Sequence, residues 1–335
     1  MKGRGFRMKR YSCLMIVIVM LVVLLAGCGN LSSNAPATEA TTESQTGASD
    51  AAKQALDGKK VIFFGNSHTY YGRCVLEKGR NDYYVTRLND QGIFAQLCAE
   101  NGLNVEVTNY TFGNHKLSDF YSGSCAAKRG HDGFDHMADI TDYNYDYVIL
   151  QQGTSADDND LIGDVEKMLA PFKEANPNVK CIFLLHLRAC SGGYKWISKV
   201  KELENQGITV VDWGGLLNGV VQGTKTVPES EEFYNQNSFI ISQSETDGYH
   251  PNMLTGYITA LMTYCAITGD RAEGQPHLLN KGNLLTSFGI AAYRSSYYTY
   301  DPDTNFEQVL LSDSEMLAWQ QLIDLHMQAK EYKEY

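Results

Sequence analysis

Residues 61–71 read V-I-F-F-G-N-S-H-T-Y-Y, and this stretch decides the fold. Four consecutive apolar residues before Gly65 predict a strand buried on both faces, as found in parallel sheets that lie beneath helices. Ser67 would follow the carboxyl end of that strand, where open α/β sheets bind ligands and where a tight turn can expose a hydroxyl. Ser67 is therefore a candidate nucleophile. The alternative is an ordinary turn, because Gly, Asn and Ser are all common in turns.

Strand and helix patterns alternate from residue 61 to residue 268. The predicted strands are 61–64, 105–112, 147–150, 179–187 and 208–211, and the predicted helices are 93–101, 161–175, 196–206 and 255–268. Parallel crossovers are right-handed and normally carry a helix, so this order predicts an α/β fold. We expect a three-layer α/β/α sandwich with a five-stranded parallel sheet. Residues 72–90 interrupt the pattern, either as part of a substrate rim or as an inert surface loop.

The N-terminus has the pattern of an exported lipoprotein. Five basic residues among the first ten precede an apolar run from Cys13 to Ala26, the order of a secretory signal. The run is shorter than the roughly 20 residues of a membrane-spanning helix. It ends in L-A-G-C at Cys28, which resembles a bacterial lipobox and implies removal of residues 1–27 and lipidation of Cys28. The mature protein is therefore expected outside the cytoplasm, anchored to a bacterial membrane by this lipid.

Composition divides the rest of the chain into three parts. Residues 28–57 are rich in Ser, Thr, Ala, Glu and Gln, which predicts a disordered tether. Residues 58–274 hold the alternating pattern and form the expected main domain. From residue 275 the chain is rich in Tyr and ends in a helix that begins with a capping box, S-D-S-E at 312–315. We interpret 275–335 as a helical appendage on the same domain, with a small separate subdomain as the alternative.

Charge, histidine spacing and cysteine context bear on possible partners, metal sites and disulfides. The formal net charge of −11 argues against a nucleic-acid partner, because phosphate binding needs a basic surface. Two His and two Asp lie within residues 131–137, but their short spacing favours a surface loop over a metal site. The cysteines other than Cys28 divide by context. Those in apolar runs are predicted to be buried thiols, namely Cys98, Cys181 and Cys265. Those in predicted loops could form a disulfide whose pairing the sequence does not give, namely Cys74, Cys125 and Cys190.

A second block, D-G-Y-H-P at residues 247–251, supplies the groups that a serine nucleophile needs. A serine hydroxyl reacts poorly until a neighbouring base takes its proton, and that base needs an acceptor on its other ring nitrogen. His250 and Asp247 can supply both groups from one turn. Pro251 suits the first position of the predicted helix that follows. His250 is thus expected near a helix N-terminus, where the dipole favours the neutral imidazole.

Together, G-N-S at Ser67 and D-x-x-H at Asp247 and His250 resemble the SGNH (GDSL-type) hydrolases. The resemblance covers roughly residues 58–270, and the blocks occur in the family's order. It implies a flavodoxin-like fold and ester hydrolysis, with Ser67 as nucleophile, His250 as base and Asp247 as its partner. Gly113, which ends the second predicted strand, matches the family's glycine. The resemblance implies that the backbone N–H groups of Gly113 and Ser67 form an oxyanion hole.

The third block departs from the family's G-x-N-D and reads Q-Q-G-T-S at residues 151–155. It looks like the Q-G-x-S version of the sialate and other carbohydrate acetylesterases, in which a Gln side chain replaces the Asn as oxyanion donor. The resemblance implies this role for Gln152, with Ser155 as the second candidate. His186 and Arg188 end the fourth predicted strand, and Asn114 follows Gly113. These three residues are candidates for substrate contact.

The resemblance implies a serine esterase that removes a small acyl group, expected to be acetyl, from a carbohydrate or related ester. Such a reaction needs no metal or cofactor. Two alternatives stay open. One is an acyltransferase with the same triad, in which a sugar hydroxyl replaces water. The other is a lipoprotein that binds a ligand without turning it over, because the lipobox and tether fit that function equally well.

Overall fold

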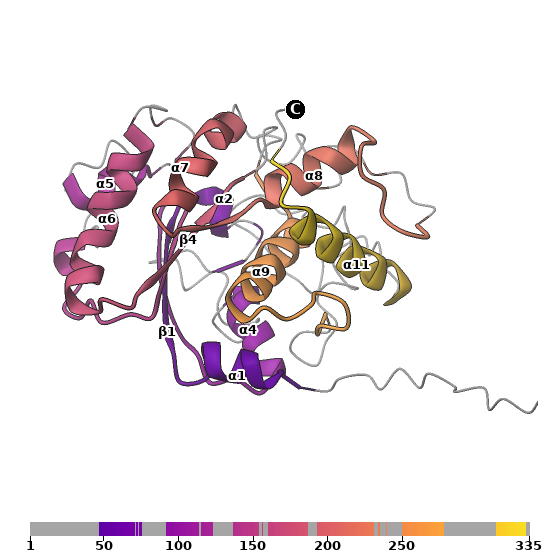
Figure 1. Ribbon diagram of the computed structural model, residues 1–335, viewed down its shortest axis with the longest axis horizontal. Helices are drawn as coiled ribbons and strands as arrows, with labels where there is room; N and C mark the ends of the chain where they lie inside the picture. Colours follow the sequence, from indigo (N-terminus) through magenta and orange to yellow (C-terminus); the bar gives the residue numbers. More distant parts are fainter. Residues whose placement is uncertain are drawn as a thin grey trace, which may run out of the picture. The chain divides into compact units, whose positions relative to one another are not determined.

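The fold is described from a computed structural model of the chain (Figure 1). The structure describes residues 47–70, 72, 74–75, 92–113, 115–122, 137–153, 156, 160–186, 193–230, 234, 239, 250–277 and 313–332. Several sequence predictions lie outside these residues, namely the signal and lipidation at Cys28, most of the loop 72–90, the block 131–136, Cys125 and Cys190, and the candidate site residues Asn114, Ser155, Arg188 and Asp247.

The centre of the fold is a parallel sheet in the order β2-β1-β3-β4-β5. Its strands are β1 (Lys60–Gly65), β2 (Glu106–Thr111), β3 (Tyr147–Leu150), β4 (Lys180–Leu184) and β5 (Thr209–Val211). In the pairing register, Phe64 lies opposite Tyr110 of β2 and Leu150 of β3. This is the strand order of flavodoxin-like sheets, and it confirms the predicted five-stranded parallel α/β architecture.

Helices cover both faces of the sheet because alternate strand residues point to opposite sides. One face, which includes Val61 and Phe63, packs against α1 (Asp50–Leu56), α4 (Gly92–Glu100), α8 (Trp213–Val221), α9 (Met253–Thr268) and α11 (Asp313–Ala329). The other, which includes Ile62 and Phe64, packs against α5 (Leu117–Ser122), α6 (Leu161–Ala175), the 3-10 segment η3 (Gly193–Lys199) and α7 (Val200–Asn205). Figure 1 shows α5 and α6 on one side of the strands and α4, α9 and α11 on the other.

The first helix corrects the predicted extent of the tether. Residues 50–56 form α1, whereas the composition predicted disorder as far as residue 57. Ser49 caps this helix by accepting a hydrogen bond from the Ala52 N–H, and Ala52 and Leu56 are fully buried. The two buried residues are four apart and share one helix face. A short polar segment is thus ordered because two small apolar contacts and a cap anchor it to the core.

Helix α8 was not expected from the sequence. Its residues W-G-G-L-L-N-G-V-V include three glycines, which lower helix propensity. The helix forms because the Asp212 side chain caps it, accepting from the Gly215 N–H at 2.7 Å, and because Trp213, Leu216 and Leu217 are fully buried.

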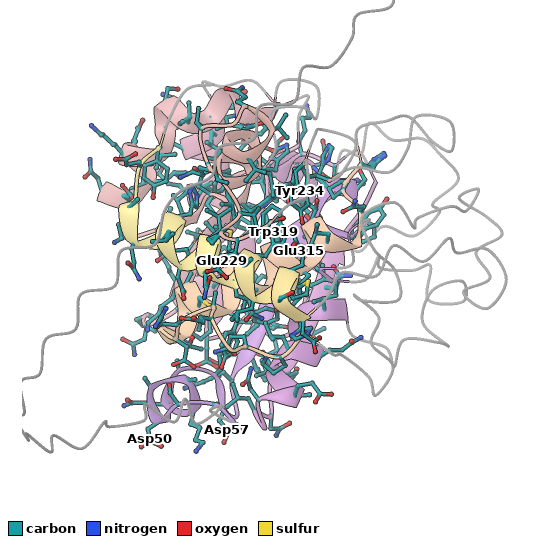
Figure 2. The ribbon with its side chains drawn as sticks, turned by 90° about the vertical axis from the view of Figure 1, so that its right-hand side faces the viewer. Asp50, Asp57, Glu229, Tyr234, Glu315 and Trp319 are labelled. Atoms are coloured by element: carbon teal, nitrogen blue, oxygen red, sulfur yellow. The ribbon has the colours of Figure 1, made fainter. Side chains whose placement is uncertain are left out.

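The C-terminal helix α11 is fixed to α9 and to the loop that follows it. The Asp324 carboxylate accepts hydrogen bonds from the backbone N–H groups of Ala272 and Glu273. Gln320 accepts from the Gly274 N–H and donates to the Tyr257 hydroxyl on α9. Further along, the Trp319 indole donates to the Tyr234 hydroxyl, which in turn donates to Glu315 (Figure 2).

Four cysteines in the described residues are free thiols and all are buried. Cys98, Cys181 and Cys265 agree with the prediction of buried thiols. Cys74 was assigned to a loop where a disulfide was considered possible, but in the structure it is 1% exposed and is a free thiol. Burial raises the pKa of the Cys98 thiol to about 12 and raises that of Cys74 still further, so neither forms a thiolate readily. Among the described helices, none combines the length and the apolar character needed to span a membrane.

Candidate active site

Ser67 lies in a tight turn at the carboxyl end of β1. A methyl group on Gly65 would lie 2.3 Å from the Thr69 hydroxyl, so only glycine fits here. The chain then turns directly into the short helix α2 (Ser67–Tyr70), because the Asn66 carbonyl accepts from the N–H groups of Thr69 and Tyr70. Ser67 is half-buried, while the residues on either side of it are buried. The turn therefore presents Ser67 at the edge of the sheet where the strands end.

The Asn66 side chain ties this turn to the loops after β2 and β3. Its carbonyl oxygen accepts from the His68 N–H at 3.0 Å and from the Gln151 amide at 3.2 Å. Its amide donates to the His115 carbonyl at 3.1 Å. Asn66 is 2% exposed, so these bonds are made away from water. An asparagine suits this position because it can accept and donate at once, which an ionised aspartate cannot do.

The glycines after β2 and β3 allow the three loops to meet. A methyl group on Gly113 would lie 3.2 Å from the Tyr70 hydroxyl of α2. A methyl group on Gly153 would lie 2.5 Å from the His115 carbonyl oxygen. Within the described residues, the backbone N–H groups of Ser67 and Gly113 donate no hydrogen bond. Both predicted backbone donors are thus beside α2 and not used by the fold.

His250 reaches the same edge because the start of α9 packs on the segment after α2. A methyl group on Gly256 would lie 1.5 Å from the Gly72 carbonyl oxygen, so the two backbones are in direct contact. The helix begins at Met253, and Asn252 caps it by accepting from the Thr255 N–H at 3.1 Å. The prediction that Pro251 starts the helix is therefore wrong, because asparagine is the stronger N-cap. His250 lies just before the helix and is 7% exposed.

Three imidazole rings from distant parts of the sequence lie together beside Ser67. The ring centroid of His68, the residue after Ser67, is 5.5 Å from that of His250 and 5.1 Å from that of His186. His250, the predicted base, is thus in contact with His68, which directly follows the predicted nucleophile Ser67. The Ser67 hydroxyl makes no hydrogen bond to any described residue, so the bond to His250 is not formed in this conformation. Such bonds are often long in enzymes without substrate and shorten when substrate binds.

Burial governs the charge of this group of rings. The pKa of His68 is held well below 6.5, first because the ring is buried and then because His186 and His250 lie beside it. His186 is fully buried at the end of β4, where its ring packs on Trp196 and Trp213 at centroid distances of 5.3 and 6.3 Å. His186 was predicted as a substrate contact, and the structure places its fully buried ring against that of His68.

Gln152, the predicted third oxyanion donor, is engaged in hydrogen bonds with other parts of the fold. Its amide donates to the Asp164 carboxylate on α6 at 2.8 Å, and its carbonyl oxygen accepts from the Leu117 N–H at 2.8 Å. The neighbouring Gln151 instead donates to Asn66 and is fully buried. The sequence reasoning did not select Gln151, although its position directly after a buried strand was a usable signal.

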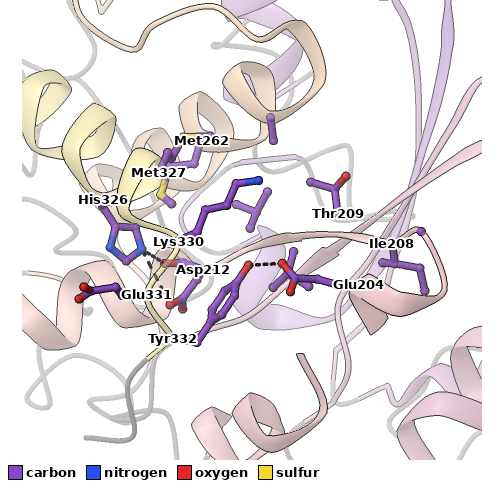
Figure 3. A pocket seen from close by; sticks show the side chains of 14 residues that line it. Glu204, Ile208, Thr209, Asp212, Met262, His326, Met327, Lys330, Glu331 and Tyr332 are labelled. Carbon is purple, nitrogen blue, oxygen red and sulfur yellow. Dashed lines mark hydrogen bonds and ion pairs between the residues drawn. The ribbon is translucent and has the colours of Figure 1, made fainter. Parts of the chain in front are cut away.

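Two observations concern other ligands. Among the residues described, no group of three or more His, Cys, Asp or Glu is arranged to hold a metal ion. A cavity of about 410 Å³ lies beside β5, at the end of α11 (Figure 3). Its lining includes Glu204, Asp212, His326 and Tyr332, and none of the predicted site residues. In it Tyr332 donates to Glu204, and His326 bonds the Asp212 carbonyl.

No family model matches the sequence, and no curated protein matches it. Solved structures do resemble this fold. They include the acetylxylan esterase Axe2 from Geobacillus stearothermophilus, with 15% identity over 64% of this chain and 95% of that chain and a TM-score of 0.43. A putative GDSL-like lipase from Parabacteroides merdae has 16% identity over 64% and 97%, with a TM-score of 0.40. A carbohydrate esterase family 2 enzyme from Corynascus thermopiles has 13% identity over 64% and 67%, with a TM-score of 0.38. These neighbours are GDSL-like lipases and carbohydrate esterases, and their low similarity leaves the function to be argued from this chain's own residues.

Proposed function

We propose that this protein is a serine esterase of the SGNH type, with Ser67 as nucleophile, His250 as general base and Asp247 as the partner of His250. One observation supports this most strongly. The sequence motifs place Ser67 after β1 and His250 before α9, far apart in the chain, and the contact of Gly72 with Gly256 brings these two segments together. A chance pair of motifs has no reason to meet at the edge where parallel sheets bind ligands.

In the proposed reaction, the Ser67 hydroxyl comes within hydrogen-bond distance of His250. His250 takes the proton, and the serine oxygen attacks the acyl carbonyl. The N–H groups of Ser67 and Gly113, which are not used within the described fold, stabilise the negative oxygen of the tetrahedral intermediate. His250 then gives the proton to the leaving alcohol. Water, activated by His250 in turn, hydrolyses the acyl-serine and regenerates the enzyme.

We propose that the backbone N–H groups of Ser67 and Gly113 are the main donors to the oxyanion. The Gln152 amide already donates one N–H to Asp164, which is buried and also accepts from the Tyr121 hydroxyl at 2.7 Å, and its carbonyl oxygen accepts from the Leu117 N–H. Because these bonds fix both ends of the amide in a buried place, we expect Gln152 mainly to hold the loops after β2 and β3 in place.

The proposed substrate is an ester of a small acyl group, such as acetyl, on a carbohydrate. It would be met outside the cytoplasm, with the enzyme held at a bacterial membrane through a lipid on Cys28. The Q-G-x-S block and the lipobox support this address and substrate class.

Hydrolysis of p-nitrophenyl acetate by the purified protein tests the proposal, with Ser67→Ala as the control. We expect turnover by the wild type and a loss of about 10³-fold or more in the variant. Equal rates in the two proteins, or no turnover in either, would exclude the serine esterase. Adding a carbohydrate acceptor to the same assay separates hydrolysis from acyl transfer, because only a transferase forms an acylated sugar.

A further inference from the structure

His68 has a defined relation to His250 that the esterase mechanism does not use. The two ring planes are inclined by 31° with centroids 5.5 Å apart, so the two rings form a tilted contact. His68 also stacks on His186 at 5.1 Å with an angle of 28°. His186 rests on Trp196 and Trp213, which are fully buried. These five rings form what we call the ring column, His250-His68-His186 with the two tryptophans at its base.

The ring column is anchored at its base and at its middle. The tryptophans belong to the packed core, and the backbone N–H of His68 is held by the Asn66 side chain at 3.0 Å. His68 is 6% exposed, so its backbone is fixed by this turn and its ring is enclosed by the protein. His250, by contrast, precedes the capped helix α9 and lies at the top of the column. A buried ring on a fixed backbone therefore lies against the ring that must change its charge during the proposed reaction.

The charge of His68 decides the sign of its effect. Among the described residues, the titratable groups that act on its pKa are His186 from the end of β4 and His250 from the segment before α9. Burial, and then these two neighbours, holds the pKa of His68 well below 6.5, so the ring is neutral near pH 7. A neutral aromatic face attracts a cation placed over it, most strongly where water is excluded. A charged His68 would instead repel the imidazolium of His250.

We infer that His68 is a positioning residue whose neutral ring holds the plane of His250 and stabilises its imidazolium form. This inference rests on the proposed function for its role in catalysis, since His250 becomes imidazolium when it takes the Ser67 proton. Its physical content does not require turnover, because the pKa of His250 can be measured directly.

The test is a histidine NMR titration of the full chain labelled with ¹³C-histidine, with the His250 signal assigned from a His250→Gln variant. His68→Leu removes the aromatic face, and His68→Phe keeps it without a titratable group. We expect His68→Leu to lower the pKa of His250 by about one unit and His68→Phe to leave it within about 0.3 units. His326→Leu, which removes a buried histidine beside Asp212, serves as the matched control and should cause no shift.

The same variants are then assayed with p-nitrophenyl acetate. We expect kcat/KM to fall about tenfold in His68→Leu, mostly in kcat, and to change less than about threefold in His68→Phe. An unchanged or raised pKa of His250 in His68→Leu would overturn the inference, as would an equal fall of the pKa in both variants. A shifted pKa without wild-type turnover would leave the ring contact standing and reject the esterase.

Discussion

Two buried histidines in this molecule have lowered pKa values for the same main reason, but one lies in the candidate active site and the other at a structural contact beside β5. Burial is the largest cause for His68 beside β1 and for His326 beside β5, and it brings the pKa of His326 to about 4. His326 is held by a hydrogen bond of 2.8 Å to the Asp212 carbonyl, which fixes one chain end to the sheet. His68 instead faces other imidazoles next to a half-buried serine. The comparison teaches that a shifted pKa alone does not mark a site, whereas converging loop ends and facing rings do.

The largest expected effect compares a histidine of each region. His250→Gln should lower kcat/KM for p-nitrophenyl acetate by about 10³-fold or more, because the serine loses its base. His326→Gln should leave kcat/KM within about threefold, because its side chain bonds a backbone carbonyl beside β5. Initial rates at pH 7.5 measure both. A similar loss of kcat/KM in the two variants would contradict the proposal that only the region of His250 takes part in catalysis.

The next effect concerns stability and pH at the β5 edge. The folded pKa of His326 lies below its unfolded value of 6.5, so the unfolded chain binds more protons between those values. The free energy of unfolding is therefore not reduced by His326 above about pH 6.5. As the pH falls from 6.5 toward 4, the preference of the unfolded chain for the proton lowers the free energy of unfolding by about 3 kcal/mol.

Urea unfolding of wild type and His326→Gln from pH 7.5 to pH 4 measures this effect. The difference between the two curves isolates His326, because the buried histidines of the site are present in both. We expect the variant to lose less stability than the wild type over this range. Parallel curves would show that His326 stays ionisable in the folded protein.

A smaller effect tests the contact that joins the two halves of the site. Gly256→Ala places a methyl group against the Gly72 carbonyl, so α9 must shift. We expect a loss of about 1–3 kcal/mol of unfolding free energy and a fall in kcat that exceeds the change in KM. Gly163→Ala on α6 is the control, since a methyl group there meets no atom within 4 Å. If both variants keep wild-type kcat, the close contact is not what positions His250.

The smallest expected effect on rate belongs to Gln152. Its bonds to Asp164 and the Leu117 N–H predict that Gln152→Ala lowers the unfolding free energy by about 1–3 kcal/mol. The fall in kcat should be less than about tenfold. A fall of 10²- to 10³-fold in kcat, with stability unchanged, is the result expected of an oxyanion donor and would support the role predicted from the sequence.

Much of the fold could be predicted because the strands are buried on both faces. Runs such as V-I-F-F in β1 and Y-V-I-L in β3 have few interpretations in an α/β chain, and each ends near a glycine or polar turn. Local patterns failed where tertiary contacts decide. Helix α8 contains three glycines, and α1 lies in a segment of low hydrophobicity, yet both have a capping side chain and bury residues in the core. Propensity is a weak guide where a cap and burial compete with it.

The site was predictable only in part, for a related reason. Ser67, Gly113 and His250 could be selected because each follows a strand or precedes a helix. The ring column could not be predicted, since His68, His186 and His250 meet only through the fold. The direction of Gln152 was equally hidden, because its partner Asp164 lies on α6. Motif spacing indicates which loops carry a site, but contacts between loops decide which side chains face it.

The most direct test of the central claim is the rate at which a fluorophosphonate modifies Ser67, followed by mass spectrometry of the intact protein and its peptides. This reagent reacts with a serine whose proton is taken by a neighbouring base. We predict one adduct, on the peptide that contains Ser67, and a rate at least about 100-fold lower in His250→Gln. Absence of the adduct, an adduct on another residue, or an equal rate in the variant would contradict the pairing of Ser67 with His250.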